Sequence, residues 1–168
     1  VRYVKRRVTG GSLRSTPATP RCVVEIGSAE QAWLCISPNM LVAPYNWLMR
    51  VGLFIPCYVD QFYPQVGLAT VEVLEHFGVE VEFPTEQTCC GQPMANAGLH
   101  DQAEPLAKRF LQIFAPYEYV VCPSGSCTSM VKHHYEQILL PSAELHAVAH
   151  KTFELCEFLT DVLKVDSV

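Results

Sequence analysis

Five of the eight cysteines of this 168-residue chain fall in three short stretches. Cys57 ends the apolar run "RVGLFIPC", Cys89 and Cys90 are adjacent in "TEQTCCGQPM", and "CPSGSC" holds Cys122 and Cys127. Adjacent cysteines suit neither a core nor a mutual disulfide. Neighbouring side chains in an extended segment point to opposite faces, and neighbouring Cα atoms are closer than the usual bridge requires. We therefore expect the adjacent pair to bind a group that other segments of the chain also contact.

Thiols at these spacings are compatible with several kinds of chemistry. A multi-iron cluster presents several metal corners, so Cys89 and Cys90 could each bind a different iron. A structural zinc ion usually takes cysteines in pairs two to four residues apart, and only Cys122 and Cys127 come close. A thiol–disulfide enzyme would normally use C-x-x-C, which this sequence lacks. The residues favour an iron–sulfur site, while zinc, redox-active thiols and plain buried thiols remain open.

The segments that would position these cysteines alternate between strand and helix. The continuous apolar run over 51–56 predicts a buried strand, the alternating "VEVEFP" over 79–84 predicts an edge strand, and a third strand is expected to end near Cys122. Helices are expected over 63–78, 101–114, 128–139 and 142–163. This alternation implies parallel strands joined by right-handed crossovers. The sequence therefore predicts a small three-layer α/β domain, a parallel sheet of order 2-1-3 flanked by helices.

Apolar stripes at helical spacing indicate which helix faces would be buried. The expected buried positions are Val66, Ala69, Val73 and Phe77 on the first helix, Ala103, Leu106, Ala107, Phe110, Leu111 and Phe114 on the second, and Leu145, Val148, Ala149, Thr152, Cys156, Leu159 and Leu163 on the last. On this pattern Cys156 is most simply a small core residue.

Parallel strands would bring the three cysteine-bearing loops to one edge of the sheet, where ligands bind in open α/β folds. The helices that follow would point their N-termini at the same edge, and free backbone N–H groups there favour thiolates and an anionic ligand. Gly91 and Gly125 would let the backbone approach a bulky inorganic group closely. We therefore expect the five cysteines to meet there as metal ligands, with these two glycines against the cofactor.

The sequence changes character near residue 48, and its charge is also uneven. Residues 1–21 carry six Lys or Arg and no acidic residue, whereas residues 22–168 carry six bases and seventeen acids. The basic start is rich in Ser, Thr, Gly and Pro, so we predict that 1–48 is a disordered or non-native leader, with a transit peptide as the alternative, and that 49–168 is the domain. Cys22 and Cys35 fall in the leader and are not expected to take part.

The composition also narrows the class of protein. An acidic body argues against nucleic acid as the main partner. No apolar run reaches the roughly 18 to 20 residues that a membrane helix needs. The start lacks the features of a secretory signal, so eight cysteines indicate metal binding or redox chemistry in the cytoplasm rather than a disulfide framework.

Three motifs, "IPCYVDQFYPQVG", "EQTCCGQPMANAG" and "CPSGSC", resemble in this order the cysteine-rich CCG-domain family of iron–sulfur proteins, and most of all its lactate-utilisation and glycolate-oxidase members. The resemblance covers about residues 50–165. It implies an α/β fold and a cytoplasmic iron–sulfur electron-transfer subunit in a complex that oxidises L-lactate or a related 2-hydroxy acid, with the other subunits as partners. On the matching positions it implies that Cys57, Cys89, Cys90 and Cys127 hold a [4Fe–4S] cluster, with zinc as the alternative.

Two departures from the family pattern shape this expectation. Cys122 looks like an addition, and Ser124 or Ser126 stands where a further thiol would be expected, which puts a five-thiolate, non-cubane cluster in doubt. Family members carry two such halves and this sequence contains one, so a second CCG half is an expected partner. Two rivals to the electron-transfer subunit are a non-enzymatic zinc or thiol scaffold and a truncated, inactive fragment.

Overall fold

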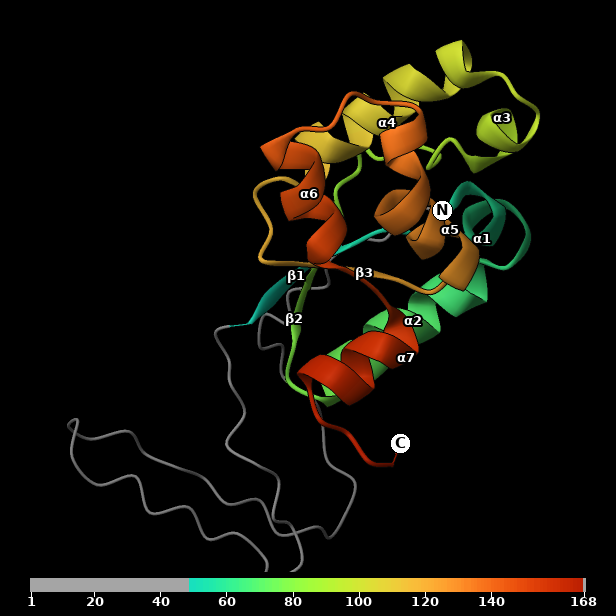
Figure 1. Cartoon of the computed structure of the whole chain (residues 1–168). Coiled ribbons are helices and arrows are strands. Elements are labelled where there is room, and N and C mark those ends of the chain that lie inside the picture. The colour runs from blue at the N-terminus through green and yellow to red at the C-terminus, as the bar shows by residue number, and fades with distance from the viewer. Residues whose placement is uncertain (1–48, 168) are drawn as a thin grey trace, which may run out of the picture. The chain divides into compact units, whose positions relative to one another are not determined.

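The computed structural model describes residues 49–167, so the predicted leader over 1–48, with Cys22 and Cys35, lies outside the described part. A parallel sheet of four strands has helices on both faces (Figure 1). The strands are β1 (Arg50–Leu53), β2 (Glu80–Glu82), β3 (Tyr119–Cys122) and β4 (Thr152–Glu154), in the order β2-β1-β3-β4. The predicted α/β class and the order 2-1-3 are confirmed, and β4 extends the sheet beyond the third strand.

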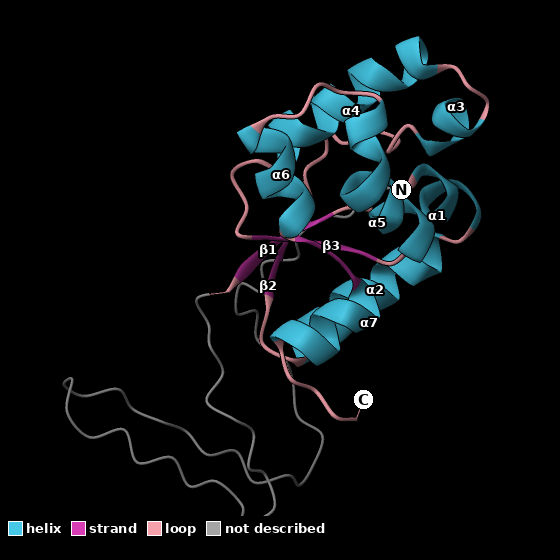
Figure 2. Ribbon diagram, in the orientation of Figure 1, coloured by secondary structure: helices cyan, strands magenta, loops and turns pink. Residues whose placement is uncertain are grey.

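The helices fall into two groups around this sheet. In Figure 2, α4, α5 and α6 lie on one face, whereas α2 and α7 lie on the other. The bounds are α1 Cys57–Phe62, α2 Pro64–His76, α3 Gln92–Asn96, α4 His100–Phe114, α5 Gly125–Ser129, the π-helical η1 Met130–His134, the 3₁₀ turn η2 Tyr135–Gln137, α6 Ala143–His150, α7 Leu155–Glu157 and the π-helical η3 Phe158–Val162. Within the described residues, no helix has both the length and the apolar character needed to cross a bilayer.

Two cores result from the alternation of side chains along the central strands. Val51 and Leu53 of β1 belong to the core under α2 and η3, which also contains Leu74 and Phe158. Phe54, the next residue, belongs instead to the core under α4, α5 and α6, which includes Cys90, Cys122 and Cys127. The thiols on this side of the sheet are therefore continuous with a hydrophobic core.

The buried face of α4 was predicted almost completely. Ala103, Ala107, Phe110, Leu111 and Phe114 are buried, and only Leu106 stays half-exposed. This helix has a regular apolar stripe, and such a stripe is a strong signal for the side that faces a core.

The predicted face of α2 is wrong by one position. The buried residues are Gly67, Thr70 and Leu74, whereas Val66 and Ala69 are exposed. Thr70 can lie on the buried face because its hydroxyl donates to the carbonyl of Val66 at 2.8 Å, which satisfies its polar group. A count of apolar residues alone overlooks a small glycine and a self-satisfied threonine as packing positions.

The single helix predicted over 142–163 is also wrong. Helix α6 ends at His150, and Thr152–Glu154 adds to the sheet beside β3, with Thr152 opposite Val120. Lys151 fixes this break, because its Nζ donates to the carbonyl oxygens of Ala115 and Tyr117 at 2.7 and 2.6 Å. Leu145, Val148, Thr152 and Leu159 are buried as predicted, whereas Cys156, expected in the core, is exposed.

The helix predicted over 128–139 begins earlier, at Gly125, and widens into a π-helical turn. Met130, Val131 and Tyr135 are the buried residues of the π-helical turn η1 and the 3₁₀ turn η2 that follows it. A π-helical turn is wider than an α-helical one because its hydrogen bonds join residues five apart. The turn brings Tyr135 into the core on the cysteine side of the sheet.

Candidate metal centre

Four of the five candidate cysteines follow the carboxyl end of a strand, and the fifth, Cys122, is the last residue of β3. Cys57 is the first residue of α1, which comes after β1, and the loop after β2 carries Cys89 and Cys90. Cys127 lies in α5, which follows β3. Because the strands are parallel, these segments meet at one edge of the sheet, and Figure 1 shows α1 and α5 together at this edge.

Four thiols from these three segments are connected by a series of sulfur–sulfur hydrogen bonds, and we call them the thiol cluster. The thiol of Cys57 donates to Sγ of Cys89 across 3.4 Å. The thiol of Cys90 hydrogen-bonds with the sulfur atoms of Cys89 and Cys127. Cys57 and Cys127 also lie close enough for their charges to interact. The structure therefore brings together Cys57, Cys89, Cys90 and Cys127, as the strand topology led us to expect.

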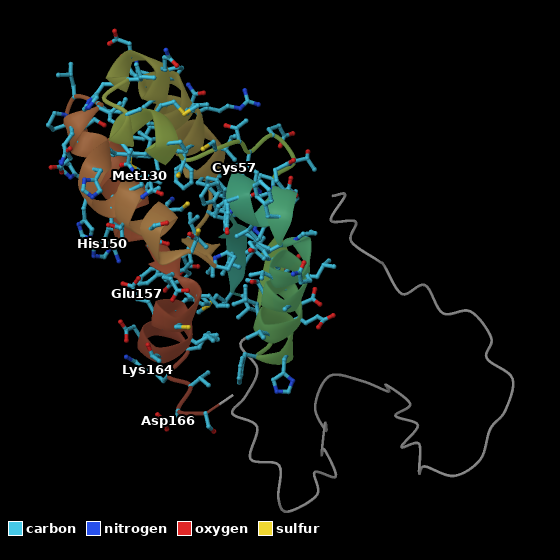
Figure 3. The ribbon with its side chains drawn as sticks, turned by 90° about the vertical axis from the view of Figure 1, so that its right-hand side faces the viewer. Cys57, Met130, His150, Glu157, Lys164 and Asp166 are labelled. Carbon is cyan, nitrogen blue, oxygen red and sulfur yellow. The ribbon has the colours of Figure 1, made fainter. Side chains whose placement is uncertain are left out.

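The thiol cluster extends from the surface into the core. Cys57 is exposed and Cys89 is half-buried, whereas Cys90 and Cys127 keep only 2% and 8% of their surface exposed. Figure 3 labels Cys57, the first residue of α1, and Met130, the first residue of η1. The cluster is thus open to solvent at one end and enclosed by apolar side chains at the other.

Two of the four sulfurs favour the thiolate form. The pKa of Cys89 is lowered to about 5, chiefly because the Cys90 thiol donates a hydrogen bond to it, with further donation from the backbone of Gly91 and the thiol of Cys57. The pKa of Cys127 is lowered to about 6, again chiefly by Cys90, with the side chains of Ser124 and Ser126 adding hydrogen bonds. Hydrogen bonds to the charged form lower a pKa in this way.

The other two sulfurs hold their protons. Hydrogen bonds to Cys127 and Cys89, together with burial, raise the pKa of Cys90 far above its usual value. Burial and the hydrogen bond to Cys89 raise the pKa of Cys57 to about 11. The thiol cluster therefore alternates between thiolates that accept hydrogen bonds and thiols that donate them.

Backbone N–H groups also point at the sulfurs. Gly91 donates to Sγ of Cys89 at 3.4 Å. Backbone hydrogen bonds from Tyr58 to Cys57 and from Gln92 to Cys90 also favour the thiolates. Donors of this kind stabilise negative charge on sulfur and, in iron–sulfur proteins, influence the reduction potential.

Gly91 and Gly125 differ in their backbone conformation and in the space available for a side chain. Gly91 has a φ of +86°, and a Cβ added there would lie 3.3 Å from the carbonyl oxygen of Ala103. Its lack of a side chain is therefore required by the turn that leads from Cys90 into α3. A Cβ added at Gly125 would meet nothing within 4 Å, so this position borders open space.

Gln87 ties the cysteine-bearing loop to the end of β1. Its Oε1 accepts from the backbone N–H of Ile55 at 2.8 Å, and its Nε2 donates to the carbonyls of Leu53 and Pro84, each at 2.9 Å. The amide thus replaces the backbone partner that β1 loses where β2 ends. We did not identify Gln87 from the sequence, because a lone polar residue in a loop is usually solvated.

Tyr135 holds the inner end of the thiol cluster. Its side chain is fully buried, and its hydroxyl donates to the carbonyl of Cys90 at 3.0 Å. Burial and the charges of the nearby cysteines raise its pKa well above the usual value, so the hydroxyl remains a donor. The sequence carried no signal for this contact, because Tyr135 lies 45 residues from Cys90 and its role depends on the π-helical turn.

Cys122 lies behind the other four sulfurs. It is fully buried at the end of β3, and its thiol donates to the carbonyl of Ser124 at 3.6 Å. Its pKa is raised well above the usual value, first by burial and then by the charge of Cys127. Cys122 therefore shares the core with Cys90 and Cys127, but its thiol hydrogen-bonds to Ser124 rather than to a sulfur of the thiol cluster.

Thiols of this kind are the ligands that soft metal ions and iron–sulfur clusters prefer. In residues 49–167, no group of three or more His, Cys, Asp or Glu side chains is placed as a site for a metal ion. The four thiols instead hydrogen-bond to one another. Metal binding would exchange these bonds for metal–sulfur bonds with release of the thiol protons, and the two depressed pKa values favour that release. The donor set thus fits an iron–sulfur cluster in chemistry.

The family model and the similar curated proteins agree with each other. Residues 51–132 match the family model of the CCG cysteine-rich domain. The chain is 50% identical over 124 residues to lactate utilization protein A of Halalkalibacterium halodurans, which covers 71% of this chain and 50% of the relative. It is 48% identical over 123 residues to the protein of that name from Geobacillus kaustophilus, covering 71% and 52% of the two chains.

The chain spans about half the length of these curated relatives. No solved structure matches it. The family match covers β1 through most of η1 and includes every member of the thiol cluster. Residues 51–132 therefore belong to the CCG cysteine-rich domain family.

Proposed function

We propose that this chain is the iron–sulfur electron-transfer part of a system that oxidises L-lactate or a related 2-hydroxy acid. The observation that carries the proposal is the meeting of four thiols, from three separate loops, at one edge of a parallel sheet. The names of the relatives, lactate utilization protein A, support the choice of substrate.

In this proposal Cys57, Cys89, Cys90 and Cys127 are the ligands of a [4Fe–4S] cluster. Four thiolates are the usual ligand set for such a cluster. Adjacent Cys89 and Cys90 can serve together because they would bind different irons, which answers why the chain places them side by side. Cys122 is the fifth thiol proposed for the site, and its place in the core suits support of Cys127 better than direct ligation.

When bound, a [4Fe–4S] cluster supplies reversible one-electron storage. The chain's own groups hold and tune it. Gly91 directs its N–H at Cys89, and Ser124 and Ser126 direct hydrogen bonds at Cys127. Gly125 leaves room beside the ligands, and Gly91 permits the turn between Cys90 and α3. The apolar core around Cys90 and Cys127 keeps water from the inner face.

The chain acts in this proposal as a subunit of an oxidoreductase complex rather than as a self-sufficient catalyst. Its partners would be the other subunits of the complex and a second CCG half, and its place would be the cytoplasm. The shared length of about half of each relative leaves room for such a second half as part of the working unit.

A zinc or thiol scaffold is the second candidate, because four thiols also suit a structural zinc ion. The two candidates differ in inorganic sulfide, which a zinc site does not contain. A truncated, inactive fragment is the third candidate, and it predicts neither metal nor a cooperative thermal transition.

The experiment is anaerobic reconstitution of the full chain with iron and sulfide, followed by a reductive titration observed by visible absorption. The proposal predicts a broad visible absorption that bleaches on reduction and returns on reoxidation, in step with bound iron and sulfide. Zinc binding without sulfide would support the scaffold. A folded chain that retains no metal would contradict both.

A further inference from the structure

We propose that Cys57 and Cys89 form a reversible disulfide with each other when the metal-free chain meets a small-molecule disulfide such as oxidised glutathione. Their sulfur atoms are already 3.4 Å apart. A disulfide bond is about 2.05 Å long, so the two atoms need to approach by roughly 1.4 Å.

Exposure selects this pair among the sulfurs of the site. Cys57 is exposed and Cys89 is half-buried, so a dissolved oxidant can reach them. Cys90, Cys122 and Cys127 are buried, with at most 8% of their surface exposed. Cys89 and Cys90 are also sequence neighbours, which is unfavourable geometry for a bridge.

The surrounding structure holds the two sulfurs close without a bond between them. Cys57 lies two residues after Ile55, and Cys89 lies two residues after Gln87. The backbone N–H of Ile55 donates to Oε1 of Gln87 at 2.8 Å, which ties the two segments together just before the thiols. A disulfide would therefore link two segments that are already joined, and it requires no new arrangement of the strands.

The reaction is a thiol–disulfide exchange. The thiolate of one cysteine attacks a sulfur of the small disulfide, whose S–S bond breaks and releases one small thiol. The other cysteine, as its thiolate, attacks the resulting mixed disulfide and releases the second small thiol. The protein loses two protons and two electrons, and the oxidant is reduced to two thiols.

The effect of this disulfide on cluster loading rests on the function proposed above. Cys57 and Cys89 are two of the four proposed cluster ligands, so the disulfide would withhold both from iron. The oxidised chain would be a protected form that loads a cluster only after reduction by a dithiol.

The test uses the full chain with Cys22→Ser, Cys35→Ser and Cys156→Ser. Of the eight cysteines, this variant keeps five, all at the site. The metal-free protein is treated anaerobically with oxidised glutathione, alkylated, digested without reduction and analysed by mass spectrometry. We expect one cross-linked peptide pair joining Cys57 to Cys89, a loss of two free thiols per chain, no retained glutathione, and recovery of both thiols with dithiothreitol. The unsubstituted chain should give the same cross-linked pair, which guards against misfolding of the variant.

Stable glutathione adducts on the two cysteines, free thiols at both, or a bridge from Cys89 to any other cysteine would overturn the proposal. Iron loading is measured separately on the reduced and the oxidised samples. Failure of the reduced chain to bind iron, with the bridge formed as expected, would contradict the proposed function alone. Equal loading of both samples would remove the protective role and contradict this inference.

Discussion

Ile55 and Gln87 are joined by a hydrogen bond of 2.8 Å, and the contact between Cys57 and Cys89 follows exactly two residues later on both segments. The side-chain amide of Gln87 thereby extends the ladder of β1 past the end of β2. A residue with no metal-binding chemistry of its own thus sets the separation of two sulfurs. The consequence can be measured in stability and in thiol chemistry.

Replacing Gln87 with Ala should destabilise the chain. The backbone N–H of Ile55 and the carbonyls of Leu53 and Pro84 would lose a partner in a partly buried place, at a cost of about 1–3 kcal/mol. Urea unfolding followed by circular dichroism measures the change. Gln102→Ala, at an exposed position of α4, is the control and should stay within about 0.5 kcal/mol of the parent. Equal midpoints for the two variants would show that the amide does not hold the loop.

Replacing Tyr135 with Phe removes the hydroxyl group at the inner end of the thiol cluster and keeps the aromatic ring. The carbonyl of Cys90 loses its donor at 3.0 Å, so the free energy of unfolding should fall by about 0.5–1.5 kcal/mol. Tyr119→Phe keeps the ring contacts with Phe153 and Phe158 and serves as the control. A Tyr135 variant as stable as this control would contradict the assigned role.

Alanine substitutions at the two glycines should separate backbone strain from room for a cofactor. Gly91→Ala forces a side chain into φ +86° and against Ala103, so we expect a loss of about 1–3 kcal/mol. Gly125→Ala meets no neighbouring atom and should keep or slightly raise stability. If Gly125 borders the cofactor, its variant should nevertheless retain less iron after reconstitution. Normal iron content in that variant would remove Gly125 from the cofactor site.

Alkylation of the metal-free chain should rise with pH at both outer cysteines, but over different pH ranges. The pKa of Cys89 is lowered to about 5, so its thiolate predominates at pH 7 and its reaction with iodoacetamide should slow only as the pH falls through about 5. The pKa of Cys57 is raised to about 11, so it should react slowly until the pH rises toward that value, although it is the more exposed residue. Peptide mapping after short pulses distinguishes the two sites. Faster labelling of Cys57 at pH 7 would mean that exposure outweighs the hydrogen bonds.

The sequence predicted those parts of the fold that rest on strong periodic signals. The apolar run at β1, the alternation at β2 and the stripe on α4 are each set by one dominant pattern, and the structure has them as expected. The convergence of the cysteine loops followed from the parallel topology. Where packing depended on small or self-satisfied residues, as at Gly67 and Thr70, the pattern pointed to the wrong face.

The missed features depend on contacts between distant segments. Strand β4 begins directly after Lys151, whose Nζ donates to the carbonyls of Ala115 and Tyr117, and no local pattern at Thr152 indicates those partners. The same holds for Gln87 and Tyr135, whose partners lie 32 and 45 residues away. The sequence likewise did not indicate which sulfurs donate hydrogen bonds and which accept them, because this depends on contacts between the three segments.

The most direct test of the ligand set is the iron and acid-labile sulfide bound per chain after anaerobic reconstitution, compared between the parent, Cys127→Ala and Cys122→Ala. Both substitutions truncate a buried cysteine on the same side of the sheet, but only Cys127 belongs to the thiol cluster. We predict about four irons and four sulfides in the parent and in folded Cys122→Ala, and a loss of most of both in Cys127→Ala. Equal loading of the two folded variants, or iron-free parent protein, would contradict the account.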